Sequence, residues 1–167
     1  MDGVGELGAS ADREVRPDET AAAKSATVAA RPPNHVVVRW RGDEEFESGR
    51  PGGPTLRIDG RGKAAQSPVD VLLTALASCS SIDVVGILAK RRTPVTSLDI
   101  DVVAERADDR VPRKVRRILL TFRLTGAGIE REHAERAVEL SVTKYCSVRD
   151  SLDPGIPIEW KVELNEE

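Results

Sequence analysis

Short apolar or alternating stretches recur along the chain and are typical of half-buried strands. Turn-forming glycine and proline residues separate them. Three such stretches lie before residue 60, at 36–40, 44–48 and 55–59. Three more follow later, at 98–105, 115–124 and 156–164. The pattern therefore predicts strands in two blocks.

A long apolar segment separates the two blocks. Ser67, Pro68 and Asp70 are suited to the N-cap, the first turn and the capping-box position of a helix. The following residues, up to Lys90, are apolar on almost every side, as expected of a helix that the rest of the protein encloses. At 1.5 Å per residue the helix would span roughly 35 Å, the diameter of a small domain. We therefore predict a central helix.

A second helix is predicted at residues 130–148, where small and apolar residues recur at helical spacing. This stripe comprises Ala134, Ala137, Val138, Ser141, Tyr145 and Val148. The predicted order is βββ-α-ββ-α-β. Because the strands occur in blocks, the order favours an α+β fold over an alternating α/β sheet.

The first 33 residues differ from the rest of the chain. They are rich in Gly, Ala, Asp, Glu and Thr, and their few apolar residues follow no period. Such a composition buries too little surface to offset the loss of chain entropy. We expect a disordered tail at 1–33 and one folded domain at 34–167, since 167 residues suffice for a single core.

Composition argues against several classes of function. A net charge of −3 argues against nucleic-acid binding, and an aromatic content of only 3% argues against base-stacking surfaces. Two histidines are too few for a His-rich metal site. Ser80, Ser81 and Asp83 interrupt the longest apolar run, and no secretory signal is recognisable, so we expect a cytoplasmic protein without a membrane helix.

The two cysteines, Cys79 and Cys146, are the main candidates for chemistry. Two are too few for a disulfide scaffold, and their separation fits no local motif. Each lies on a predicted helix, where a free cysteine is often a small buried hydrophobe. Only the fold could bring them together, so an inert and a reactive interpretation both stay open.

A reactive cysteine needs its thiolate stabilised. Cys79 lies in the middle of its predicted helix, and Cys146 lies near a helix C-terminus, where the dipole disfavours an anion. We therefore expect a cation to stabilise the thiolate. Asp70 could orient a guanidinium, or could serve only as a capping acid. By position, the candidate cations are Arg50, Arg57 and Arg149.

Two groups of motifs resemble the OsmC/Ohr family of osmotically inducible and organic hydroperoxide resistance proteins. Residues 67–73, 75–79 and 83–85 are similar to the family's central helix. Residues 136–141 and 144–148 are similar to the second-cysteine helix of its OsmC-like branch. The resemblance covers residues from about 34 to 167 and leaves out the tail.

The resemblance implies antiparallel strands wrapped around a long central helix in an intertwined homodimer, with active sites at the subunit interface. It implies thiol-dependent reduction of organic hydroperoxides, with hydrogen peroxide as a further candidate, and no metal or cofactor. Cys79 would be the peroxidatic thiolate and Cys146 the resolving thiol, regenerated by an external dithiol such as a lipoyl compound. Arg57, with Arg50 as the alternative, would stabilise the thiolate, and Asp70 would orient that arginine. A redox-sensing or ligand-binding dimer without efficient turnover is the alternative function.

Overall fold

The computed structural model describes residues 31–165. The chain divides into two units, Met1–Asn34 and His35–Glu167. Most of the predicted tail lies outside the described residues, so that expectation stays a prediction.

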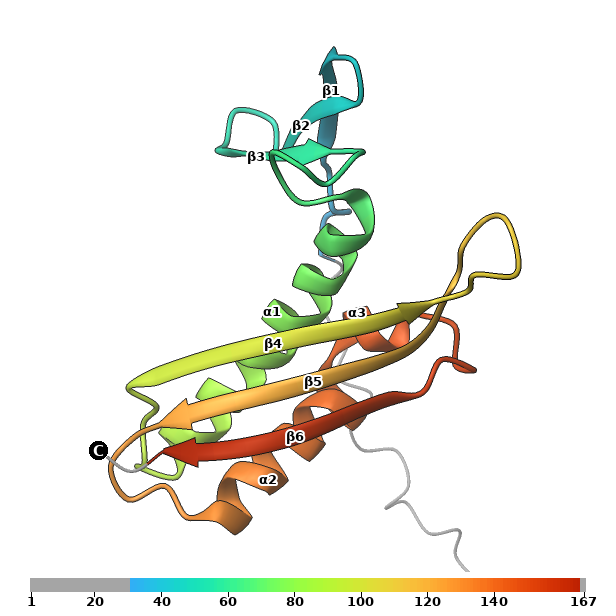
Figure 1. Ribbon diagram of the computed structural model, residues 1–167. Helices are drawn as coiled ribbons and strands as arrows, with labels where there is room; N and C mark the ends of the chain where they lie inside the picture. The colour runs from blue at the N-terminus through green and yellow to red at the C-terminus, as the bar shows by residue number, and fades with distance from the viewer. Residues whose placement is uncertain (1–30, 166–167) are drawn as a thin grey trace, which may run out of the picture. The chain divides into compact units, whose positions relative to one another are not determined.

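The second unit has an α+β architecture with two three-stranded sheets (Figure 1). The first sheet comprises β1 (Val37–Gly42), β2 (Glu45–Gly49) and β3 (Thr55–Asp59), and the second comprises β4 (Ser97–Arg106), β5 (Val115–Thr125) and β6 (Ile158–Asn165). The helices are α1 (Pro68–Lys90), α2 (Arg131–Leu140) and the short α3 (Ser147–Asp150). The predicted fold class and central helix are confirmed.

Strand pairing differs from the prediction at one place. The β1–β2, β2–β3 and β4–β5 pairs are antiparallel, as expected. Strand β6 instead runs parallel to β5, from Ile118 opposite Ile158 to Thr125 opposite Asn165. The reason is the intervening segment, because α2 crosses the sheet and returns the chain to the end at which β5 began.

The core lies between the β4–β5–β6 sheet and the helices that cover one of its faces (Figure 1). Helix α1 begins as predicted, with Ser67, Pro68 and Asp70 forming its capped first turn. Its fully buried residues recur every four positions, which places them in one stripe. This stripe comprises Leu76, Ser80, Val84 and Leu88.

Residues 31–165 do not cover the other sides of α1, so within this described part the prediction of an enclosed helix is wrong. Leu72, Ile82 and Val85 are 39%, 73% and 41% exposed. By length and composition α1 would also suffice to cross a membrane, because Ser80, Ser81 and Asp83 do not lower its hydropathy enough. The core helix of a folded domain meets the same criteria, and α1 packs on the second sheet.

The β1–β2–β3 sheet has one apolar and one charged face. Its register aligns Trp40 with Phe46 and Phe46 with Ile58, whereas Arg39 and Arg57 flank Glu47 on the opposite face. On the charged face, further ion pairs join Arg41 to Glu47 and Arg57 to Glu45. On the apolar face, Val38, Trp40 and Leu56 are 59%, 67% and 44% exposed. Hence the described part of the chain leaves this apolar face uncovered.

Candidate active site

The predicted second helix is interrupted just before Cys146. Helix α2 is followed by a π-helical segment, Ser141–Tyr145, whose wider turn lets the Cys146 N–H donate to the Ser141 carbonyl at 2.9 Å. Cys146 itself is extended, with φ −73° and ψ 98°. The prediction of one continuous helix over 130–148 is therefore wrong, and Tyr145 does not join its buried stripe but is 48% exposed.

Cys146 begins a new helix instead of ending an old one. It is the N-cap of α3, and its Sγ accepts a hydrogen bond from the Arg149 N–H at 3.4 Å. The electrostatic consequence is the opposite of the one expected from the sequence. Main-chain N–H groups that have no acceptor within α3 gather at this point, where carbonyl groups were predicted.

Buried hydroxyl groups fasten this segment to α1. The Ser141 hydroxyl donates to the Ser80 carbonyl at 2.7 Å, and the Ser80 hydroxyl donates to the Leu76 carbonyl at 3.0 Å. The Cys146 thiol contacts the same Leu76 carbonyl at 3.9 Å. Because both serines are fully buried, these bonds are shielded from water and fix the register of the π-helical segment against α1.

The fold brings Cys79 beside Cys146 at the start of α3. The Cys79 sulfur lies 3.9 Å from the Ser147 hydroxyl. Burial is the largest single influence on its pKa and raises it, but hydrogen bonds outweigh burial and leave the pKa of Cys79 below its ordinary value. The donors are the Val148 N–H, the Cys146 thiol, and the hydroxyl and N–H groups of Ser147.

The pKa of the second thiol, Cys146, is shifted in the opposite direction. Cys146 is only 3% exposed, and burial raises its pKa. Hydrogen bonds from Ser80 and from the Arg149 N–H lower the pKa in part, whereas the neighbouring Cys79 raises it further. The thiols therefore ionise in a fixed order: Cys79 loses its proton first, and Cys146 keeps its own and donates a hydrogen bond.

The arginines expected at the thiolate have other positions in this chain. Arg57 lies on the charged face of the first sheet, 3.2 Å from Glu45, and Arg50 is exposed in the loop after β2. Arg149 contributes its main-chain N–H to Cys146 and is one of the residues that line a cavity of 240 Å³ beside Cys146. Within this chain N–H, O–H and S–H donors lower the pKa of Cys79, and the expectation of a stabilising cation stays a prediction.

Asp70 forms the predicted capping box. Its carboxylate accepts from the Ser67 N–H at 2.8 Å, and its own N–H donates to the Ser67 hydroxyl at 3.3 Å. The side chain and then the main chain of Ser67 lower the pKa of Asp70, and Arg106 adds a smaller effect. The carboxylate lines a groove of 420 Å³ between α1 and β4, together with Gln66.

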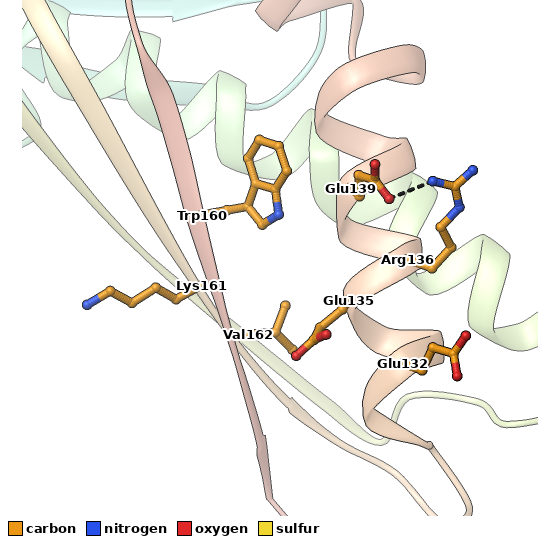
Figure 2. Close-up of a pocket in the computed structure, with 7 residues that line it drawn as sticks. All are labelled: Glu132, Glu135, Arg136, Glu139, Trp160, Lys161 and Val162. Carbon is orange, nitrogen blue, oxygen red and sulfur yellow. Dashed lines mark hydrogen bonds and ion pairs between the residues drawn. The ribbon is translucent and has the colours of Figure 1, made fainter.

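A larger cavity, of 690 Å³, lies between α2 and β6 and contains neither cysteine (Figure 2). Glutamates of α2 and Trp160 line it, and Arg136 pairs with Glu139 across one turn at 2.6 Å. Among residues 31–165 no group of three or more His, Cys, Asp or Glu side chains could hold a metal ion. Both cysteines, Cys79 and Cys146, are free thiols.

The fold and the site define a class of protein: an α+β domain with one cysteine on a long central helix and a second at the start of a neighbouring helix. Comparison with known proteins places the chain within one family. The family described as OsmC-like protein matches residues 60–161, so the chain belongs to this family.

Individual relatives agree with this assignment. The protein YhfA from Escherichia coli strain K12 is 35% identical over 128 residues, covering 76% of this chain and 95% of YhfA. The crystal structure of a hypothetical protein from Aquifex aeolicus is 26% identical, with a TM-score of 0.68 over 81% of this chain and 99% of that one. An organic hydroperoxide resistance protein OsmC from Legionella pneumophila has the same fold at 11% identity, with a TM-score of 0.58 over 80% of this chain and 99% of that one.

Sequence analysis missed the donors at the start of α3. A signal was present, because Cys146-Ser147 is followed by Asp150, an acid in the first turn of α3, and this order is compatible with a helix start. The apolar stripe extending through Tyr145 to Val148 hid that start. Every residue except proline carries a main-chain N–H, so a sequence does not show which N–H groups lack a partner within a helix. Locating them required recognising that the helix is interrupted before Cys146.

Removing one N–H donor tests which groups lower the pKa of Cys79. Pro at the first position of α3 is compatible with a helix start, so Ser147→Pro removes the N–H and the hydroxyl while α3 persists. Ser147→Ala is the matched control, because it removes the hydroxyl alone. A hydrogen bond to a charged group contributes about 1.5–3 kcal/mol, so Ser147→Pro should slow alkylation of Cys79 at neutral pH by about tenfold relative to Ser147→Ala. Equal rates in the two variants would contradict the assignment.

The opposite pKa shifts also predict the order of labelling with pH. The Cys79 pKa is lowered and the Cys146 pKa is raised, so as pH rises the Cys79 thiolate forms first. Iodoacetamide labelling followed by peptide mass mapping should modify Cys79 at a lower pH than Cys146. Denatured protein provides the control, since both cysteines should then titrate together.

Proposed function

We propose that this protein is a thiol-dependent peroxidase that reduces organic hydroperoxides through a two-cysteine cycle. The observation that carries the proposal is the pair Cys79 and Cys146, with one pKa lowered and the other raised at the same site. Membership of the OsmC-like family supports it, as does the shared fold with an organic hydroperoxide resistance protein.

In the first step the Cys79 thiolate attacks the outer oxygen of the hydroperoxide. The O–O bond breaks, the sulfur becomes a sulfenic acid, and the inner oxygen takes a proton and leaves as an alcohol. Cys146 lies beside Cys79 and keeps its proton where Cys79 has lost its own, so it is the group placed to supply that proton. This proton transfer leaves Cys146 as the thiolate that the next step requires.

In the second step the Cys146 thiolate attacks the sulfur of the Cys79 sulfenic acid. The S–O bond breaks, hydroxide leaves and takes a proton to become water, and a Cys79–Cys146 disulfide forms. An external dithiol then reduces this disulfide by two thiol–disulfide exchanges and is itself oxidised to a disulfide. Each cycle consumes one hydroperoxide and one dithiol and produces an alcohol and water.

We further propose that the working form is a homodimer. The uncovered apolar face of the first sheet and the exposed apolar side of α1 are the surfaces that a second copy would cover. An exposed apolar sheet face is stabilised when it is packed against another surface, and nothing within residues 31–165 covers Val38 and Trp40. The roles predicted for Arg57 and Asp70 then concern the assembled dimer, since in one chain each has another partner.

Replacing each cysteine separately distinguishes the two roles. Cys79→Ser should reduce consumption of cumene hydroperoxide to the background rate, because the variant lacks the thiol whose pKa is lowered. Cys146→Ser should consume one equivalent and stop, and dimedone should trap the sulfenic acid on Cys79. Ser78→Ala is the control, because that hydroxyl bonds only within α1. Full activity of Cys79→Ser would refute the proposal.

The alternative function is a redox sensor. The deep burial of Cys146 would favour it by hindering reduction of the disulfide. Steady-state kinetics separate the two functions. With excess dithiol the peroxidase turns over many times. A sensor would consume one equivalent of hydroperoxide per chain and then cease.

Sedimentation analysis tests the dimer. The wild-type protein should sediment at twice the chain mass of 18.1 kDa. Ile82→Lys places a charge on the most exposed apolar position of α1 and should shift the protein towards the monomer. Lys161→Gln, an exposed change on β6, should leave the mass unchanged. A wild-type monomer at micromolar concentration would contradict the proposed assembly.

A further inference from the structure

The cavity beside Cys146 lies on one side of the cysteine pair. It has a volume of 240 Å³ and is lined by the end of the π-helical segment and by α3. Cys146 contributes to its wall, whereas Cys79 does not. The cavity therefore borders Cys146, which is only 3% exposed, and does not border Cys79.

Two cationic residues are among those that line this cavity. Arg149 is half-buried, and its guanidinium forms no ion pair with any carboxylate in the described part of the chain, residues 31–165. The Lys144 ammonium lies 5.5 Å from the centre of the Tyr145 ring and likewise has no carboxylate partner there. Asp150 is the one acid of the wall, so the cavity carries a positive excess although the whole chain is net negative.

We infer that this cavity binds the thiol reductant, that the reductant carries an anionic group held by Arg149 and Lys144, and that its sulfur attacks Cys146 of the disulfide. The inference rests on the proposed function, which supplies the Cys79–Cys146 disulfide. The ligand class is a dithiol with a carboxylate or comparable anion.

The geometry of exchange agrees with this direction of attack. A thiolate attacks a disulfide in line with the S–S bond, from the side opposite the departing sulfur. The cavity wall includes Cys146 but not Cys79, which is compatible with an approach to Cys146 that leaves Cys79 as the departing thiolate. The N–H and hydroxyl donors at the start of α3 then receive that thiolate, and the better-stabilised thiolate leaves faster.

The dithiol alone supplies the two electrons that reduce the Cys79–Cys146 disulfide. Its first thiolate forms an S–S bond to Cys146 while the Cys79–Cys146 bond breaks and Cys79 takes the electron pair. The second thiol of the same molecule loses its proton and attacks the first reductant sulfur, which closes a cyclic disulfide and releases Cys146 as a thiolate. Cys146 then takes up a proton from water. The protein gains two electrons, and the dithiol loses two.

A pair of dithiols that differ in charge tests the binding step. The disulfide form is prepared with one equivalent of diamide, so a protein without peroxidase activity would still report on reduction. Dihydrolipoate and dihydrolipoamide have the same thiols, but only the first carries a carboxylate. At low salt dihydrolipoate should reduce the wild-type disulfide roughly two- to fivefold faster, the size expected for partly exposed charge pairs.

Variants assign that preference to the cavity. Arg149→Gln and Lys144→Gln should each bring the ratio of the dihydrolipoate rate to the dihydrolipoamide rate towards one, because each removes a charge that attracts the carboxylate. Lys161→Gln removes an equal charge on the outer side of β6 and should preserve the ratio (Figure 2). Equal wild-type rates, or a preference that survives both cavity variants, would overturn the anion site.

The attacked sulfur is identified by trapping. The oxidised protein is mixed briefly with 3-mercaptopropionate, quenched with iodoacetamide and mapped by mass spectrometry. The mixed disulfide should lie on Cys146 and the alkyl group on Cys79. The reverse distribution would overturn the direction of attack. Failure of cumene hydroperoxide to oxidise the protein would refute the proposed function separately, because diamide still supplies the disulfide.

Discussion

The arrangement of the site depends on the break in the chain at Cys146. The π-helical segment Ser141–Tyr145 ends there, and the extended Cys146 redirects the chain so that the first N–H groups of α3 face Cys79. Buried hydrogen bonds from Ser141 to α1 hold that break in register. Without it the helix would continue and present its carbonyl groups near Cys79. The same two cysteines would then lack the donors that favour a thiolate.

The break also makes the two sulfurs different. Cys79 is half-buried and receives several hydrogen bonds, whereas Cys146 is buried and donates one. Because a lowered pKa favours both attack on a peroxide and departure from a disulfide, the Cys79 sulfur suits both steps. The other sulfur suits resolution and exchange with a reductant. The division of roles follows from burial and from main-chain donors.

Much of the fold could be predicted from the sequence. The capping box at Ser67 and Asp70 fixed the start of α1, and alternation located the strands within a few residues. Parallel pairing of β6 could not be predicted, because it depends on the path of α2 over the sheet. The two cysteines could be named from their motifs, but the donors to Cys79 could not, since an apolar stripe predicted a continuous helix through Val148. The exposed side of α1 also escaped prediction, because composition does not reveal which surfaces one chain covers.

The central claim is that one chain holds Cys79 ready to react and Cys146 ready to resolve it. Mass mapping after one equivalent of cumene hydroperoxide tests this claim most directly. The account predicts a loss of two hydrogens per chain, a peptide crosslink between Cys79 and Cys146, and a monomeric band on a non-reducing gel. Over-oxidation of Cys79 to sulfinic acid while Cys146 stays free, or a crosslink between two chains, would contradict it.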